Sequence, residues 1–131
     1  MITKVGSVQI NNSFSGQNYL PYSVGLLQAY AQQYLKNPDR FEFLLPIYTR
    51  LKIDKAIEYL INADIVLFST YVWNFRLSVK IAEELKIRYP EKFIVFGGPH
   101  VPDNSNIFLN QYPFIDMAAH KEGERIIVPL L

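Results

Sequence analysis

The chain has 131 residues, of which 50% are hydrophobic and 15% aromatic. So many apolar side chains exclude a disordered or linker segment, and the length suits one domain with a sizeable core. The 13 basic and 12 acidic residues are spread along the chain and leave a formal net charge of +1, which does not support a nucleic-acid-binding surface.

Cysteine is absent from the sequence. Disulfides, thiolate nucleophiles, thiolate zinc sites and an iron–sulfur cluster held by this chain alone are therefore excluded. No stretch approaches the roughly 18 consecutive apolar residues of a membrane span, and the first residues lack the apolar core of a signal peptide. We expect a cytoplasmic protein without a membrane segment, and the sequence leaves its oligomeric state open.

The first half of the chain predicts two strands and two helices. Residues 4–10 are rich in β-branched side chains and predict a strand, which a polar loop at 11–18 follows. Apolar residues then recur at three- and four-residue spacing through 21–35, which predicts an amphipathic helix. Residues 41–46 predict a second strand, and we expect Asp54 to cap a short helix after it.

The second half continues this alternation of strands and helices. Its third strand is almost wholly apolar, which is typical of a central parallel strand buried on both faces. The predicted elements, in chain order, are a strand at 64–69, a helix at 75–89, a strand at 92–96, a helix at 105–111, a weak strand at 115–119 and a short helix at 124–131.

Strands that alternate with helices form right-handed βαβ units with parallel pairing. Five such strands favour an open, doubly wound α/β sheet of the flavodoxin-like (Rossmann-like) type, formed by a single domain over residues 1–131. The apolar third and fourth strands belong in the middle, which predicts the strand order 2-1-3-4-5. In such a sheet a ligand binds at the carboxyl ends of the strands, where the order reverses between strands one and three.

Three loops are expected to converge on that crevice, and the first follows the first strand. It is dense in hydroxyl, amide and glycine groups, so that Asn11, Ser13 and Gly16 can approach a phosphate or an amide closely. An ordinary polar loop is the alternative.

The second loop begins with two hydroxyl side chains, Ser69 and Thr70, and continues with Tyr71 and Trp73. Trp73 is the only tryptophan, and its flat face can cover a planar ligand. The alternative is that the two aromatic rings pack under a loop or against a missing neighbour.

The third loop starts with Gly97 and Gly98, followed by Pro99. Paired glycines at the end of a parallel strand allow a ligand to touch the backbone where a Cβ would collide. We favour this ligand contact over a tight turn fixed by Pro99. We also expect Gly98→Val to block the ligand while leaving the domain folded.

Several familiar reaction sites are missing from the sequence. There is no glycine-rich dinucleotide loop and no Gly-x-x-x-x-Gly-Lys phosphate loop. Ser69 stands where a phospho-accepting domain needs an aspartate, and neither His100 nor His120 is spaced with carboxylates as a metal ligand. No nucleophile–base–acid set can be assembled, so the sequence predicts a binding module with no catalytic and no metal-ligating residue.

Three sequence motifs together resemble a known family. They are ADIVLFSTYVWN at the third strand, KFIVFGGPHVP at the fourth, and YPFID with KEGE near the fifth. In this combination the chain is similar, over nearly its whole length, to the amino-terminal cobalamin (vitamin B12)-binding domain of B12-dependent radical S-adenosylmethionine (SAM) enzymes. The resemblance implies a fragment of a longer enzyme, of methyltransferase type. A downstream radical SAM domain would carry a [4Fe–4S] cluster and S-adenosylmethionine.

The resemblance also implies roles for the loops. The Ser69–Thr70 turn would line the pocket of the cobalamin nucleotide tail, and the Gly97–Gly98 pair would let that tail pass close to the fourth strand. The stretch 71–73 would lie near the lower face of the corrin ring. The Asp-x-His-x-x-Gly motif of many B12 proteins is not present, because Ser13 stands in place of the histidine that binds cobalt.

Two other functions suit the same fold. A flavin mononucleotide (FMN)-binding electron carrier would use residues 13–17 around the phosphate and Trp73 on the flavin ring, although the loop lacks the threonine-rich spacing of flavodoxins. A domain without a working cofactor site, used for docking or as a spacer, is the remaining alternative.

Overall fold

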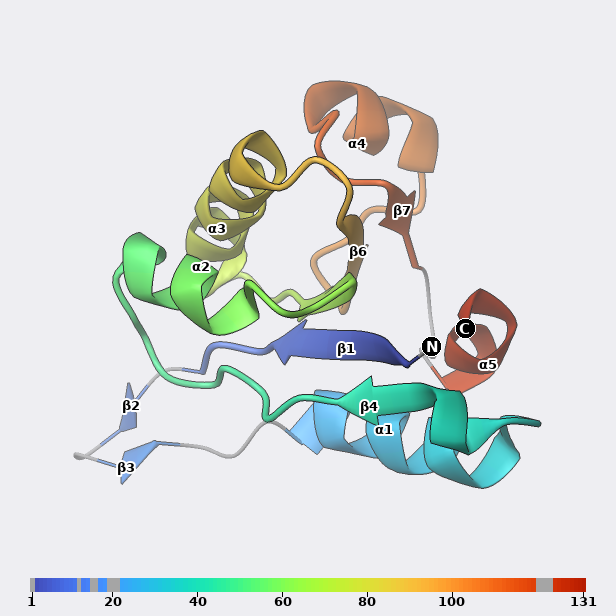
Figure 1. Cartoon of the computed structure of the whole chain (residues 1–131). Coiled ribbons are helices and arrows are strands. Elements are labelled where there is room, and N and C mark those ends of the chain that lie inside the picture. Colours follow the sequence, from blue (N-terminus) through green and yellow to red (C-terminus); the bar gives the residue numbers. More distant parts are fainter. Residues whose placement is uncertain (1, 12, 15–16, 19–21, 120–123) are drawn as a thin grey trace.

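A five-stranded parallel sheet forms the centre of the molecule (Figure 1), a computed structural model that describes residues 2–11, 13–14, 17–18, 22–119 and 124–131. Its strands in chain order are β1 (Thr3–Val8), β4 (Phe41–Phe43), β5 (Ile65–Ser69), β6 (Phe93–Gly97) and β7 (Met117–Ala118). The spatial order is β4-β1-β5-β6-β7, with parallel pairing throughout. Counted along the chain this order is 2-1-3-4-5, so the predicted flavodoxin-like fold is confirmed.

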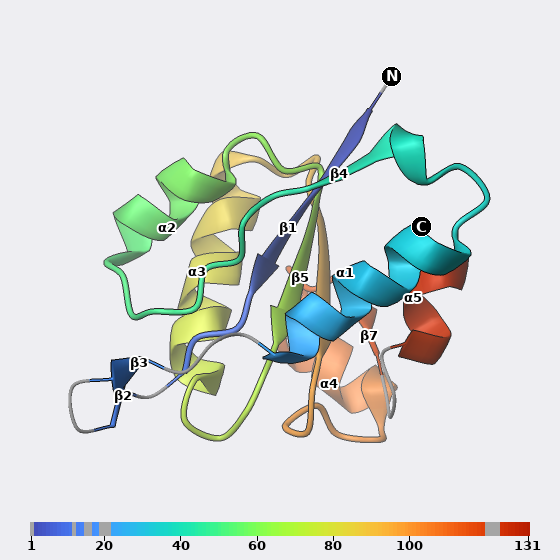
Figure 2. The same ribbon diagram turned by 90° about the horizontal axis from the view of Figure 1, so that it is seen from below.

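Helices cover both faces of the sheet, as a doubly wound fold requires (Figures 1 and 2). One face carries α2, α3 and α4, and the other carries α1 and α5. The helices are α1 (Tyr22–Tyr34), α2 (Ile53–Leu60), α3 (Phe75–Arg88), α4 (Ser105–Gln111) and α5 (Glu124–Leu130), with a 3₁₀ turn at Pro38–Arg40.

The central strand β5 shows why its sequence reads as a continuous apolar run. Side chains alternate across a strand, so Val66 and Phe68 enter the core beneath α2 and α3, while Leu67 enters the core beneath α1 and α5. All three are at most 6% exposed. Both faces of the strand are therefore buried, as predicted from the apolar pattern.

Glycine at position 6 lets α2 lie directly on β1. A Cβ there would stand 2.9 Å from Leu60 Cδ2 and 3.1 Å from Ala63 Cβ, which is closer than ordinary contact. The end of α2 therefore rests on the backbone of the strand, and this close contact helps to fix the strand that begins the candidate site.

Two local predictions were wrong. Asp54 does not cap α2, because Lys52 occupies the N-cap position without a side-chain cap bond and Asp54 instead pairs with Arg88 at 2.8 Å. The loop at 11–18 is not wholly irregular, since Ser13–Phe14 and Gln17–Asn18 form a small antiparallel hairpin, β2 and β3.

The second sheet strand is also shorter than predicted, with three residues in place of six. Pro46 lacks an amide hydrogen and cannot donate to the neighbouring strand. Pairing with β1 resumes only at Ile47, whose N–H donates to the carbonyl of Ser7 at 3.0 Å.

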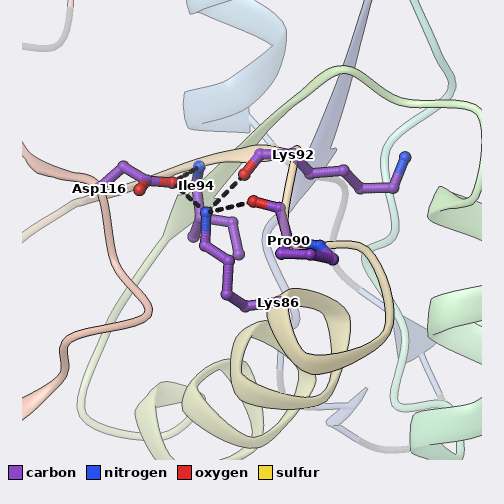
Figure 3. A network of polar contacts seen from close by, with 5 residues as sticks. All are labelled: Lys86, Pro90, Lys92, Ile94 and Asp116. Atoms are coloured by element: carbon purple, nitrogen blue, oxygen red, sulfur yellow. Dashed lines mark hydrogen bonds and ion pairs between the residues drawn. The ribbon is translucent and has the colours of Figure 1, made fainter.

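A polar network joins the last turn of α3 to the amino ends of the strands (Figure 3). Lys86 Nζ donates to the carbonyl of Lys92 at 2.6 Å and to Asp116 Oδ2 at 2.7 Å. Asp116 Oδ2 also accepts the N–H of Ile94 at 2.8 Å. These bonds fix α3, β6 and the segment leading into β7 to one another at the edge opposite the predicted site.

Candidate functional site

The predicted crevice lies where β1 and β5, neighbours in the sheet, send their chains to opposite faces. After β1 the chain leads to α1, and after β5 it leads to α3 on the other face (Figure 2). Ser69 ends β5 and Thr70 follows it, with 7% and 0% of their surface exposed, so neither side chain is solvent-exposed. Ser69 pairs with Gly97 across the sheet, which brings the second and third predicted loops together.

Thr70 links these two loops through its own hydrogen bonds. Its hydroxyl donates to the carbonyl of Gly97 at 2.7 Å, and its N–H donates to the same oxygen at 2.8 Å. The carbonyl of Thr70 accepts the N–H of His100 at 3.1 Å. The hydroxyl proton is thus used within the protein, and the fully buried Thr70 side chain serves to hold the two loops together.

The two glycines of the third loop have different roles. Gly98 has φ +95°, and a Cβ on it would lie 2.5 Å from the Thr70 carbonyl oxygen and 2.6 Å from the Thr70 nitrogen. A Cβ on Gly97 would meet Ala119 Cβ at 3.6 Å, an ordinary contact. These contacts argue against the expectation that Gly98→Val leaves the domain undisturbed, because Gly98 is needed by the backbone itself.

Gly97, unlike Gly98, is not required by the backbone conformation. The backbone conformation at Gly97 accommodates a side chain without strain, so the turn does not explain why this residue is glycine. It pairs with the buried Ser69 across the sheet, and Ala119 is the residue that a side chain there would touch.

Tyr71 and Trp73 form a stacked aromatic pair in the second loop. Their ring centroids are 4.7 Å apart and the planes differ by 7°. The hydroxyl of Tyr71 lies 2.7 Å from Ser23 Oγ of α1, and Arg50 donates to the carbonyl of Trp73 at 2.9 Å. Trp73 nonetheless keeps 42% of its surface exposed, so the rings pack on each other, as the alternative interpretation expected, and part of the indole stays accessible.

Asn74 was not among the predicted site residues, yet it is the most connected side chain of this region. It is fully buried and donates through Nδ2 to the carbonyls of Ile10 at 2.9 Å and Ser69 at 3.1 Å. Its Oδ1 accepts the N–H of Tyr71 at 2.8 Å. An asparagine just before a helix looks like an ordinary cap in the sequence, which is why it was missed.

The other predicted residues are placed less completely. Asn11 donates its N–H to the carbonyl of Tyr48 at 3.1 Å, and Ser13 belongs to β2. Gly16 and His120 lie outside the described residues. Pro99 is exposed, at the start of the turn that leads to His100.

His100 packs against an aromatic ring of α3. The exposed imidazole of His100 lies beside Phe75, with the ring centroids 4.5 Å apart. Within the part of the chain that the structure describes, no three His, Cys, Asp or Glu side chains are grouped so as to hold a metal ion. In the same described part, no helix is long and apolar enough to cross a membrane.

The fold is a doubly wound α/β domain, and Ser69, Thr70 and Gly97 lie together at the carboxyl edge of its sheet. The fold alone is shared with the crystal structure of the pilus assembly protein CpaE from Caulobacter crescentus CB15, at a TM-score of 0.59 and 13% identity. That match covers 97% of this chain and 92% of the other. No known protein-family profile matches the chain.

Sequence comparison identifies the relatives more closely. The chain is 38% identical over 106 residues to the cobalamin-dependent radical SAM methyltransferase TokK of Streptomyces tokunonensis. It is 35% identical over 113 residues to the 2-(S-pantetheinyl)-carbapenam-3-carboxylate methyltransferase of Streptantibioticus cattleyicolor. The alignments cover 81% and 86% of this chain, and it spans only 16% and 17% of those relatives. The resemblance predicted from the motifs is confirmed: the chain is homologous to one segment of cobalamin-dependent radical SAM methyltransferases.

Proposed function

We propose that this chain is the cobalamin-binding module of a radical SAM enzyme of methyltransferase type, and that it binds cobalamin without an axial histidine. The observation that carries the proposal is the identity of 38% to a cobalamin-dependent methyltransferase over 81% of the chain. The fold supports it independently, because a doubly wound sheet binds its ligand at the edge where the predicted residues lie.

The proposed contacts are at that edge. The cofactor's nucleotide tail would pass close to Gly97, with the Ser69–Thr70 turn beside it. Trp73 offers exposed aromatic surface to the corrin ring. The proposed binding residues are Asn11, Ser13, Gly16, Ser69, Thr70, Tyr71, Trp73, Gly97, Gly98 and Pro99.

The division of labour explains why the described residues contain no catalytic set. Cobalamin, when bound, supplies the cobalt centre that carries the transferred methyl group. The residues of this chain would bind the corrinoid, orient it and limit access of water to its lower face. The parent enzyme would add a downstream radical SAM domain with a [4Fe–4S] cluster and S-adenosylmethionine, for which this chain has no cysteine.

Cofactor retention separates this proposal from its rivals. The purified chain is mixed with hydroxocobalamin and, separately, with FMN, then desalted and examined by visible spectroscopy. We expect retained corrin absorbance near one equivalent and no retained flavin. Retained flavin would favour an electron carrier, and retention of neither would favour a docking or spacer domain; either result contradicts the proposal.

A further inference from the structure

We infer that Asn74 is a positioning residue that fixes the aromatic pair Tyr71–Trp73 relative to the carboxyl end of β1. The inference rests on the proposed function and identifies the residue that shapes that site without touching the cofactor. It starts from one buried side chain and the three strand and loop segments that it joins.

The side-chain amide of Asn74 forms three hydrogen bonds, two donated by Nδ2 and one accepted by Oδ1. Both donated bonds go to backbone carbonyls, one following β1 at Ile10 and one ending β5 at Ser69, at 2.9 and 3.1 Å. The accepted bond comes from the N–H of Tyr71 at 2.8 Å. One side chain therefore joins the ends of the two strands that flank the crevice to the loop that carries the aromatic pair.

This pattern differs from helix capping. Asn74 occupies the N-cap position of α3, where an asparagine ordinarily accepts an N–H from the first turn of the helix. It makes no such cap bond, and its side chain points back to Ile10, Ser69 and Tyr71. Serine and aspartate are equally good caps, but neither supplies two donors and one acceptor from a single planar group.

The position of Tyr71 is consequently fixed at both ends. Its backbone N–H is held by Asn74, and its hydroxyl lies 2.7 Å from Ser23 Oγ at the start of α1. Trp73 stacks on this ring with planes only 7° apart, so its orientation follows that of Tyr71. Asn74 thereby sets where the aromatic surface stands relative to the loop that follows β1.

The test uses the cofactor-free chain first, because Trp73 is the only tryptophan and reports on its own surroundings. Near-ultraviolet circular dichroism and tryptophan emission are recorded for the wild type, Asn74→Asp and Asn104→Ala. Asn74→Asp keeps the shape and the acceptor but loses both donors. Asn104→Ala is the matched control, because Asn104 accepts the N–H of Ile107 as an ordinary cap of α4.

We expect Asn74→Asp to change the Trp73 signals and to weaken hydroxocobalamin binding roughly three- to tenfold, the effect of having to order a loop on binding. Asn104→Ala should lower the melting temperature and leave both readouts unchanged. Unaltered Trp73 spectra in folded Asn74→Asp, or altered spectra with unchanged cobalamin affinity, would overturn the inference.

Two outcomes separate this inference from the proposed function. If the wild type retains no cobalamin while the Trp73 spectra still depend on Asn74, the proposed function fails and the positioning of the pair stands. If Asn74→Asp does not fold, amide hydrogen exchange of the wild type tests whether the bond from Tyr71 N–H to Asn74 is formed. The Tyr71 N–H should be protected at least about a hundredfold, as a buried bonded amide is, and free exchange there would overturn the inference.

Discussion

Replacing Gly98 by alanine is expected to destabilise the fold far more than the same change at Gly97. At φ +95° an L-residue costs about 1–2 kcal/mol more than glycine. The added Cβ would also lie 2.5 and 2.6 Å from backbone atoms of Thr70, which cannot rotate away as a side chain would. Forcing such contacts costs a further 1–3 kcal/mol, roughly, so the total loss is about 2–5 kcal/mol.

Thermal and urea unfolding of the two alanine variants measure this difference. A loss of this size should lower the melting temperature of Gly98→Ala by roughly 8–20 °C in a domain of this length. Gly97→Ala should stay within about 0.5 kcal/mol of the wild type, because its Cβ would meet Ala119 at 3.6 Å. Equal stability of the two variants would refute the assignment of Gly98 to the backbone turn.

Three further substitutions test contacts elsewhere. Burial lowers the pKa of Lys92 below its ordinary 10.5. Between the lowered pKa and 10.5 the unfolded chain therefore binds more protons than the folded chain. The stability of the wild type relative to Lys92→Met should consequently rise as the pH increases towards 10.5. Paired urea titrations measure this, and a constant difference contradicts it. Asp116→Ala removes the carboxylate that accepts from the N–H of Ile94 and from Lys86, which keeps its bond to the Lys92 carbonyl. The loss should cost about 1–3 kcal/mol by thermal unfolding, and no loss would show the network to be dispensable. His100→Ala keeps the backbone bond to Thr70 and should leave cobalamin retention unchanged; a stripped cofactor would make the imidazole a ligand contact.

The strand order could be predicted because a strand buried on both faces has a nearly continuous apolar sequence. The mostly apolar runs 64–69 and 92–96 are typical of central parallel strands, and they form β5 and β6. Elements at the edge of the sheet are less constrained by burial, so single residues determine where they end and which partners they bind. Pro46 shortened β4, and Asp54 was drawn to Arg88 rather than to the end of its own helix.

The site was predictable in its location and not in its internal bonds. Strand ends are visible in the sequence, so the meeting of Ser69 and Thr70 with Gly97 could be anticipated. The separate roles of Gly97 and Gly98 depend on a backbone angle and on the distance to another loop, neither of which has a local sequence signal. The bonds of Asn74 to Ile10 cross 64 positions of the chain and likewise become visible only in three dimensions.

Equilibrium dialysis of hydroxocobalamin against the wild type and Gly97→Val tests the central claim most directly. The valine adds bulk where the proposed tail would pass, at a position whose backbone does not require glycine, and Ala29→Val adds side-chain bulk at an exposed position of α1 as the control. We predict one bound equivalent for the wild type and the control. We also predict loss of binding in Gly97→Val at an unchanged melting temperature. Equal affinity of Gly97→Val and the wild type would contradict the placement of the cofactor at the carboxyl edge of β6.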